Sequence, residues 1–343
     1  VGPVADQRNT RRIRARASAG SGRVVRMRAW RVHELGDPSA ITLDEVPTPT
    51  PDEGQLLVRV RAAALNFPDV LMAMGTYQVR PPLPFVPGIE LCGEVEGTGQ
   101  RVLGVPAGGH GAFAEHVLMD ADRAWPVPDG MSDEQAAALY ITYQTGHVGL
   151  HRRARLQAGE WLLVHAGAGG VGSAAIQLGK AAGARVIATA GGPEKVQVCR
   201  DLGADHVVDY TAEDFVPVVK EVTGGAGADV VVEPVGGDVF DRSRRCVAFE
   251  GRLVVVGFTS GRIPEAPANH VLVKNYSVVG LHWGLYLQHE PSIFGVVQEE
   301  LTRLWAAGAI DPLVSQVLPF EEAPRGLAAL GSRATVGKVV LRP

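Results

Sequence analysis

The chain has 343 residues, of which 46% are hydrophobic and 20% are charged, and its net charge is −4. Its length fits about two domains, each with its own core. Residues 1–26 hold seven Arg against one Asp, which leaves the remainder strongly acidic. An acidic body argues against nucleic-acid and membrane partners. Three scattered cysteines without a CxxC motif fit a reducing cytoplasm, so we expect a cytoplasmic protein.

The first 26 residues form an Arg-rich extension, 1–26, that we expect to be disordered. It has neither an apolar core region nor an amphipathic period, which excludes a secretory signal. One interpretation is a transit peptide or an anion-binding arm. We favour a start assigned too early, with translation beginning at Met27, and we expect its removal to leave activity unchanged.

The part that follows is rich in predicted strands. Val58 and Val60 alternate with arginines, as in a half-buried strand. Ser132 and Gln135 form a capping-box pattern at the start of a predicted helix. The predicted elements are strands over Leu56–Ala62 and Leu91–Val95, a short helix over Asn66–Met74 and a longer helix over Asp133–Leu150.

A glycine-rich motif follows the buried strand predicted over Trp161–Val164, and a helix and a second strand (Arg185–Thr189) come after it. This order is typical of a dinucleotide-binding βαβ unit. Gly167 permits the tight turn, Gly169 lets a pyrophosphate approach, and Gly172 lets helix and strand pack closely. The backbone at Gly170 and Val171 then offers free N–H groups to the anion. A merely tight βα turn remains the alternative.

The end of the second strand indicates which dinucleotide is bound. NAD-binding proteins usually place an acidic residue there to hold the ribose 2′-hydroxyl. This chain has Ala190-Gly191-Gly192 instead, with Lys195 shortly after. An uncharged pocket beside a lysine suits a 2′-phosphate, so we predict NADPH. Glu194 is the complication, and we expect it to face solvent.

After the glycine-rich motif, strands and helices continue to alternate, which predicts a parallel sheet covered by helices on both faces. The tail returns to the β-rich part. We therefore expect a dinucleotide domain over 151–291, inserted in a β-rich domain formed by 27–150 and 292–343. The remaining predicted strands are His206–Asp209, Asp229–Val232, Leu253–Val256, Ser277–Leu281, Val314–Val317 and Gly337–Leu341, and the tail helix is Ile293–Ala306.

Several stretches together resemble the medium-chain dehydrogenase/reductase superfamily, and within it the NADPH:quinone oxidoreductases of the zeta-crystallin type. The resemblance implies an α/β fold in which a Rossmann doubly wound parallel sheet is inserted in a β-rich GroES-like domain. The stretches are Asn66-Phe-Pro-Asp-Val-Leu, Gly75-Thr-Tyr77, Pro81-Pro-Leu-Pro-Phe-Val-Pro-Gly88, Ala166-Gly-Ala-Gly-Gly-Val-Gly172 and Gly251-Arg-Leu-Val-Val-Val-Gly-Phe258.

The resemblance also implies roles for individual residues. Asn66 would contact the nicotinamide and substrate, and Tyr77 would line the acceptor pocket, where Leu71 departs from a tyrosine of some relatives. The other implied cofactor-binding residues are Thr145 near the nicotinamide, Gly191, Lys195 and Tyr210 at the 2′-phosphate, Gly257 and Phe258 at the nicotinamide half, and Arg333. The simpler alternatives are a helix cap for Asn66 and packing for Tyr77 and Tyr210.

We expect no metal. In zinc-dependent relatives a Cys near the position of Asn66 and a His after Gly88 bind zinc, and this chain has neither. We interpret His110, Glu115 and His116 as a turn that enters a strand. Two further expectations concern single residues: Asp69 is a solvated or helix-start charge, and His165 is a satisfied core histidine.

The resulting hypothesis is an enzyme that transfers a hydride from NADPH to a quinone or another α,β-unsaturated carbonyl, without zinc. One alternative is an enoyl-thioester reductase of the acyl-CoA type. The other is a non-catalytic, crystallin-like NADPH-binding protein. We expect a small-molecule substrate, no nucleic-acid or membrane partner, and a homodimer formed through the strand Ser277–Leu281, as the resemblance implies.

Overall fold

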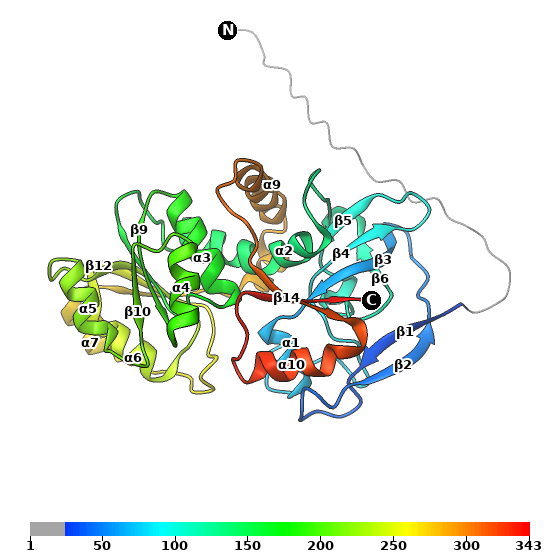
Figure 1. The fold of residues 1–343 in the computed structure, drawn as a ribbon, viewed down its shortest axis with the longest axis horizontal. Coiled ribbons are helices and arrows are strands. Elements are labelled where there is room, and N and C mark those ends of the chain that lie inside the picture. The colour runs from blue at the N-terminus through cyan, green and yellow to red at the C-terminus, as the bar shows by residue number, and fades with distance from the viewer. Residues whose placement is uncertain (1–24) are drawn as a thin grey trace, which may run out of the picture.

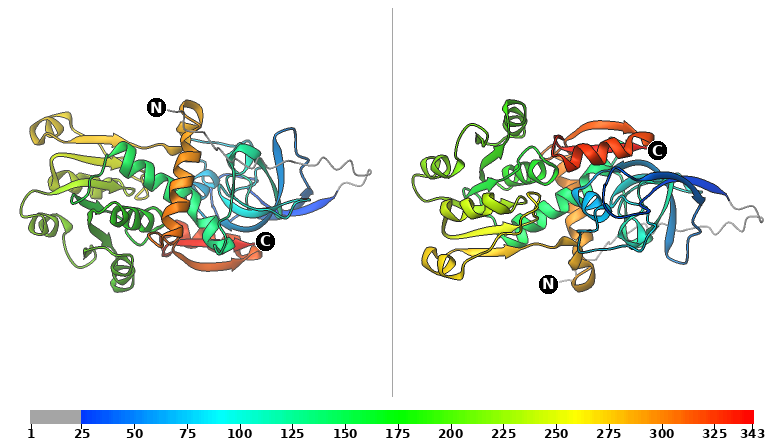
Figure 2. Two further views of the ribbon diagram at one scale, coloured as in Figure 1. Left: turned by 90° about the horizontal axis from the view of Figure 1, so that it is seen from above. Right: turned by 90° about the horizontal axis from the view of Figure 1, so that it is seen from below.

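The computed structural model describes residues 25–343, so the expected extension 1–26 lies outside the described residues except for its last two, and Arg26 already begins strand β1. A parallel sheet with its helices lies at one end of the molecule and a β-rich part at the other (Figure 1). Helices α2 (Asp133–His147) and α9 (Ile293–Ala306) lie between them, as both views of Figure 2 show for α9. Within residues 25–343, no helix combines the length and apolar character needed to cross a bilayer.

The parallel sheet has six strands in the order β10-β9-β8-β11-β12-β13. The chain enters this sheet at the central strand β8 and adds β9 and β10 on one side. It then crosses to the other side of β8, where it forms β11, β12 and β13. The crevice at such a reversal is where ligands of doubly wound sheets bind. The strands are β8 (Trp161–Val164), β9 (Arg185–Ala190), β10 (His206–Asp209), β11 (Ala228–Glu233), β12 (Val247–Val255) and β13 (Ser277–Gly280).

Both faces of this sheet are buried, which explains its continuous apolar strands. In β8, Leu162 and Val164 enter one core with α2, α3 and α4, while Trp161 and Leu163 enter another with α5 and α6. His165 follows β8 and is a satisfied core histidine, as predicted: its ring nitrogens lie 2.9 Å from Thr189 Oγ1 and 2.8 Å from Ser243 Oγ. The helices are α3 (Gly170–Ala181), α4 (Pro193–Asp201), α5 (Phe215–Val222), α6 (Gly237–Cys246) and α7 (Ala268–Lys274).

The β-rich part draws on both ends of the chain, as predicted. Its main sheet has the order β14-β15-β3-β4-β5-β7, with β6 also paired to β3, and a separate pair joins β1 and β2. The strands are β1 (Arg26–Arg31), β2 (Thr42–Pro47), β3 (Gln55–Ala64), β4 (Leu91–Val95), β5 (Arg101–Gly104), β6 (His116–Asp120), β7 (Ala124–Pro126), β14 (Val314–Pro319) and β15 (Lys338–Arg342). The short helices are α1 (Phe67–Ala73), α8 (Tyr286–His289) and α10 (Ala323–Gly331).

Helix α2 begins where the sequence predicts. The Ser132 hydroxyl accepts from the Gln135 N–H, and the Gln135 side chain accepts from the Ser132 N–H, both at 3.1 Å. The predicted end at Leu150 is wrong, because the α-helix stops at His147 and the chain continues as a π-helical turn over Val148–Arg153. The fold is therefore the predicted Rossmann sheet joined to a GroES-like part, while the expected domain boundaries remain predictions.

Candidate active site

The glycine-rich turn joins β8 to α3, and its shape depends on close backbone packing. Ala166, which precedes Gly167, takes the left-handed conformation in this turn, with φ of 51°. A Cβ on Gly172 would lie 2.1 Å from the Ala166 carbonyl oxygen, so this position tolerates only glycine. A Cβ on Gly169 would meet only the same oxygen, at 3.2 Å. The first turn of α3, from Gly170 and Val171, can therefore receive an anion at close range.

The predicted 2′-phosphate residues gather at the carboxyl ends of β9 and β10. Tyr210 lies against Gly191 so closely that a Cβ there would be 2.6 Å from the tyrosine hydroxyl. Lys195, in the first turn of α4, donates from Nζ to the Arg333 carbonyl oxygen at 2.8 Å. Glu194 is exposed, as expected. Three segments far apart in sequence thus meet around one uncharged strand end.

A carboxylate does lie near this place, at the end of β10. Asp209 Oδ1 accepts hydrogen bonds from Gly192 N at 3.0 Å and from the Thr211 hydroxyl at 2.6 Å. These bonds lower the Asp209 pKa, the Thr211 hydroxyl most strongly. The carboxylate therefore stabilises the two turns that carry Gly191 and Tyr210.

Gly257 and Phe258 follow β12 and lie beside the turn after β11. A Cβ on Gly236 would be 3.1 Å from Phe258 Cδ1. Sequence reasoning missed Glu233, the buried last residue of β11, which accepts hydrogen bonds from Val235 N and Gly236 N. Burial raises its pKa to about 7. Its position at a strand end was the available signal, and its effect is to hold the backbone turn against which Phe258 packs.

Asn66 belongs to a buried polar cluster that the sequence did not predict. Its partners are Glu90, which precedes β4, and Lys338, the first residue of β15. Lys338 Nζ lies 2.6 Å from Glu90 Oε1 and 2.7 Å from Asn66 Oδ1, and Asn66 Nδ2 donates to Glu90 Oε1 at 2.9 Å. These three side chains are 0–5% exposed. The motif Gly88-Ile89-Glu90 was a signal in the sequence for Glu90. Nothing in the sequence indicated Lys338, which lies 248 residues away from it.

Asp69 lies next to this cluster, and its expected solvation is wrong because the side chain is fully buried. The expected place at the start of a helix is correct, because Asp69 lies in the first turn of α1. Its carboxylate accepts hydrogen bonds from Asn66 N at 2.8 Å and from Gly88 N at 3.1 Å. Burial raises the Asp69 pKa to about 7. Tyr77 is half-buried nearby, and burial, together with the Asp69 charge, raises its pKa, so its hydroxyl keeps its proton.

The glycine-rich turn between β8 and α3 lies next to the Asn66 cluster, and the contact is made at the start of α3. A Cβ on Gly170 would lie 3.2 Å from both Lys338 Cδ and Thr142 Cγ2. Thr142 belongs to helix α2, and Thr145 is buried on that helix three residues later. The structure therefore places the start of α3 beside Lys338 and Thr142, next to the Asn66 cluster.

The residues at this place do not fit a catalytic zinc ion. Zinc needs three or four Cys, His or carboxylate ligands, and residues 25–343 contain no such group of three His, Cys, Asp or Glu side chains. The Glu90 carboxylate is already bonded to a lysine, an amide and the Ile141 N–H. His110 and His116 bond to separate partners, the Val86 carbonyl and Glu96, and His116 begins β6 as expected.

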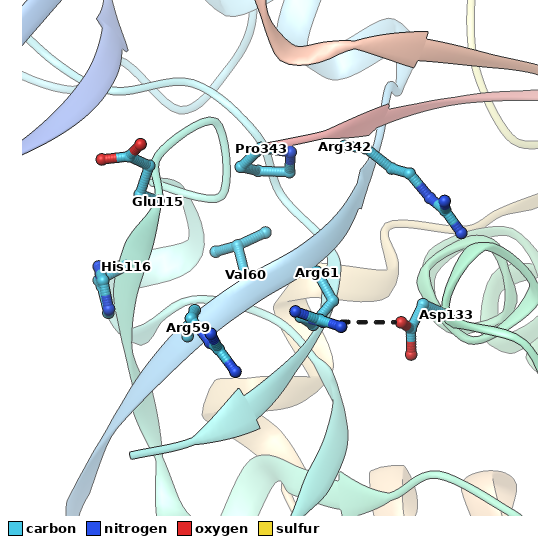
Figure 3. A pocket seen from close by; sticks show the side chains of 8 residues that line it. All are labelled: Arg59, Val60, Arg61, Glu115, His116, Asp133, Arg342 and Pro343. Atoms are coloured by element: carbon cyan, nitrogen blue, oxygen red, sulfur yellow. Dashed lines mark ion pairs between the residues drawn. The ribbon is translucent and has the colours of Figure 1, made fainter. Parts of the chain in front are cut away.

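A hollow of about 530 Å³ lies elsewhere, over β3 and β6 beside the last residues of the chain (Figure 3). Its three arginines are each paired: Arg59 with Glu94, Arg61 with Asp133, and Arg342 with Glu134. No predicted site residue lines it.

Known proteins match the chain over both parts. Residues 52–129 match the alcohol dehydrogenase GroES-like domain, and residues 170–298 match the zinc-binding dehydrogenase family. Quinone oxidoreductase-like protein 2 homolog of Nematostella vectensis is 38% identical over 325 residues, which cover 92% of this chain and 88% of that protein.

Solved structures agree. The quinone oxidoreductase of Thermus thermophilus, solved also as its complex with NADPH, is 35% identical with a TM-score of 0.79, covering 92% of this chain and 100% of that one. The CurK enoyl reductase is 28% identical with a TM-score of 0.82, covering 92% and 99%. This chain belongs to the medium-chain dehydrogenase/reductase superfamily, in its family of quinone oxidoreductase-like proteins.

Proposed function

We propose that the protein is an NADPH-dependent reductase of quinones or other α,β-unsaturated carbonyls that works without zinc. The observation that carries the proposal is the uncharged end of β9: Tyr210 lies against Gly191, Lys195 follows four residues later, Glu194 is exposed, and Asp209 accepts hydrogen bonds from the neighbouring turns. A 2′-phosphate fits these groups, whereas a 2′-hydroxyl would lack its usual acidic partner. The NADPH complex of the Thermus relative supports the same choice.

The residues that would hold the cofactor span the crevice. The N–H groups at Gly170 and Val171 face the pyrophosphate position, Lys195 and Tyr210 take the 2′-phosphate, and Phe258 flanks the nicotinamide half. When bound, NADPH supplies a hydride to the acceptor. The protein's part is to orient the two reactants and exclude water between them.

We propose Tyr77, rather than Asn66, as the hydrogen-bond donor at the acceptor end. Both amide hydrogens of Asn66 are already donated, to Glu90 Oε1 and to the Ala64 carbonyl at 3.2 Å. The Tyr77 hydroxyl is protonated and half-buried. A donor aimed at the acceptor oxygen stabilises the negative charge that develops there when the carbonyl accepts a hydride. Asn66 instead helps to shape the site.

The test is steady-state kinetics with NADPH and NADH on a panel of quinones and enones. We expect turnover with at least one acceptor and a higher kcat/KM with NADPH. Turnover with none of them, in a protein that binds NADPH, would favour the non-catalytic alternative. An apo and a zinc-supplemented sample should have equal activity, and activation by zinc would overturn the metal-free mechanism.

Enoyl-thioester reduction is the second candidate, because the CurK enoyl reductase shares the fold over nearly the whole chain. The chemistry differs only in the group that activates the double bond, so the same crevice could serve it. Assays with an enoyl-CoA discriminate the two: a kcat/KM above that of every quinone and simple enone would replace the first candidate with the second.

We also propose a homodimer through the edge strand β13. Large apolar side chains are exposed on the two elements that come before β13 in the chain: Phe249 of β12 and Leu272 and Val273 of α7 are 70–82% exposed. Pairing of two β13 strands would cover both edges. Sedimentation at micromolar concentration should give a dimer mass, and a monomer there would reject the proposal.

A further inference from the structure

Lys338 is a buried cation whose hydrogen bonds are all internal. It is 3% exposed, and its Nζ donates to the Leu65 carbonyl at 2.9 Å as well as to Asn66 Oδ1 and Glu90 Oε1. An ammonium group has three donors, so none is left for a substrate. Lys338 can therefore act on the reaction only through its partners.

These partners define the orientation of the Asn66 amide. An ammonium only donates and an ionised carboxylate only accepts. The amide oxygen must therefore face Lys338 and the amide nitrogen must face Glu90, which is the arrangement observed. Rotating the amide by 180° would place like groups against each other. The charge pair thus selects one of two orientations that are otherwise nearly equal in shape.

The same lysine also lies against the glycine-rich turn between β8 and α3. Its Cδ lies 3.2 Å from where a Cβ on Gly170 would be. The preceding residue, Gly337, donates its N–H to the Ala168 carbonyl at 2.7 Å and forms a bridge with Gly169. Lys338 and its neighbour Gly337 therefore link the turn expected to hold the pyrophosphate with the amide expected at the nicotinamide.

A role in stability alone does not account for such a pair. Replacing both members of a buried ion pair by uncharged groups is often neutral or stabilising, because desolvation opposes their attraction, whereas removing one member is strongly destabilising. An uncharged replacement of Lys338 and Glu90 would lose the fixed orientation of the Asn66 amide.

We propose that Lys338 is a positioning residue: together with Glu90 it fixes the Asn66 amide against the start of α3 and so places the nicotinamide end of NADPH. The proposal rests on the proposed function for the identity of the cofactor. It assigns to Lys338 and Glu90 no contact with the reacting atoms.

The experiment compares Lys338→Met with the double variant Glu90→Gln/Lys338→Met. The control is Glu160→Gln/Arg252→Met, which removes a half-buried ion pair from the other part of the molecule. For each protein we would measure Tm, kcat, and the Kd of NADPH and of adenosine 2′,5′-bisphosphate, which lacks the nicotinamide half.

We expect Lys338→Met to lower Tm and kcat. In the double variant Tm should return to within a few degrees of wild type, while kcat stays about 10²-fold low, as for a misplaced reactant. Its Kd for NADPH should rise at least fivefold, about 1 kcal/mol, with the Kd for the bisphosphate unchanged. The control should keep the wild-type kcat and Kd ratio.

Recovery of kcat and of the Kd ratio together with Tm in the double variant would show a structural role alone and overturn the inference. So would a double variant that loses affinity equally for both ligands, or one that stays unfolded while the control folds. If the wild type reduces no acceptor, the proposed function fails separately, and the ratio of the two Kd values still decides the inference.

Discussion

Replacing Lys195 with Met removes the ammonium group that we place at the 2′-phosphate and keeps the apolar stem of the side chain. A charge-assisted hydrogen bond contributes about 1.5–3 kcal/mol. Lys195 is partly exposed, and in the free protein its Nζ already bonds the Arg333 carbonyl. Solvent screening and the loss of that bond reduce the net gain to about 1–2 kcal/mol, which corresponds to a five- to thirtyfold change in affinity.

The assay is the Kd of NADPH and of NADH, from titrations of nicotinamide fluorescence at low and high salt. We expect Lys195→Met to raise the Kd for NADPH by that factor and to leave the Kd for NADH within twofold. The difference should shrink as salt increases. Lys180→Met is the control, because that lysine is also partly exposed but pairs with Asp205. Equal losses for both cofactors, or tighter binding of NADH by the wild type, would refute the phosphate assignment.

Three further predictions concern the turn, the acceptor end and pH. Gly172→Ala places a Cβ 2.1 Å from the Ala166 carbonyl oxygen, so urea unfolding should show a loss of about 3 kcal/mol or more, against less than about 0.5 kcal/mol for Gly284→Ala; a small loss would mean that the turn can relax. Tyr77→Phe should lower kcat about 10²-fold with an unchanged NADPH Kd, and an unchanged kcat would remove Tyr77 from the mechanism. Because burial raises the Asp69 pKa to about 7, the folded protein keeps a proton that the unfolded chain releases from about pH 4 upward, so its free energy of unfolding should fall by up to about 4 kcal/mol between pH 4 and 7. Asp69→Asn should lack that part of the slope, and equal slopes would contradict the assignment.

The dinucleotide half of the fold could be predicted because its signals are local. The strand Trp161–Val164 has the predicted bounds, since an apolar run between polar residues and glycines permits little else. Gly172 had a packing role that the motif implied and the structure bears out. Even here, the left-handed conformation of Ala166 had no signal in the sequence, because alanine rarely adopts it.

The acceptor end could be predicted only in part, because long-range contacts determine it. Nothing near Asp69 in sequence indicates that its side chain is fully buried and bonded to the Gly88 N–H. Likewise, Lys338 resembles an ordinary lysine at the start of a strand until Glu90 and Asn66 are placed around it. Residue types and spacing identified Asn66. That both of its amide hydrogens are donated within the protein could be learned only from the fold.

The position of β15 has a consequence for biosynthesis. This strand lies between β14 and β3, so the sheet begun near residue 55 stays unfinished until residues 338–342 are made. The parallel sheet has all six strands by residue 280 and can fold earlier, since domains generally fold as units during translation. Until β15 is made, the edge of β3 that it covers stays open and is available to wrong pairing partners.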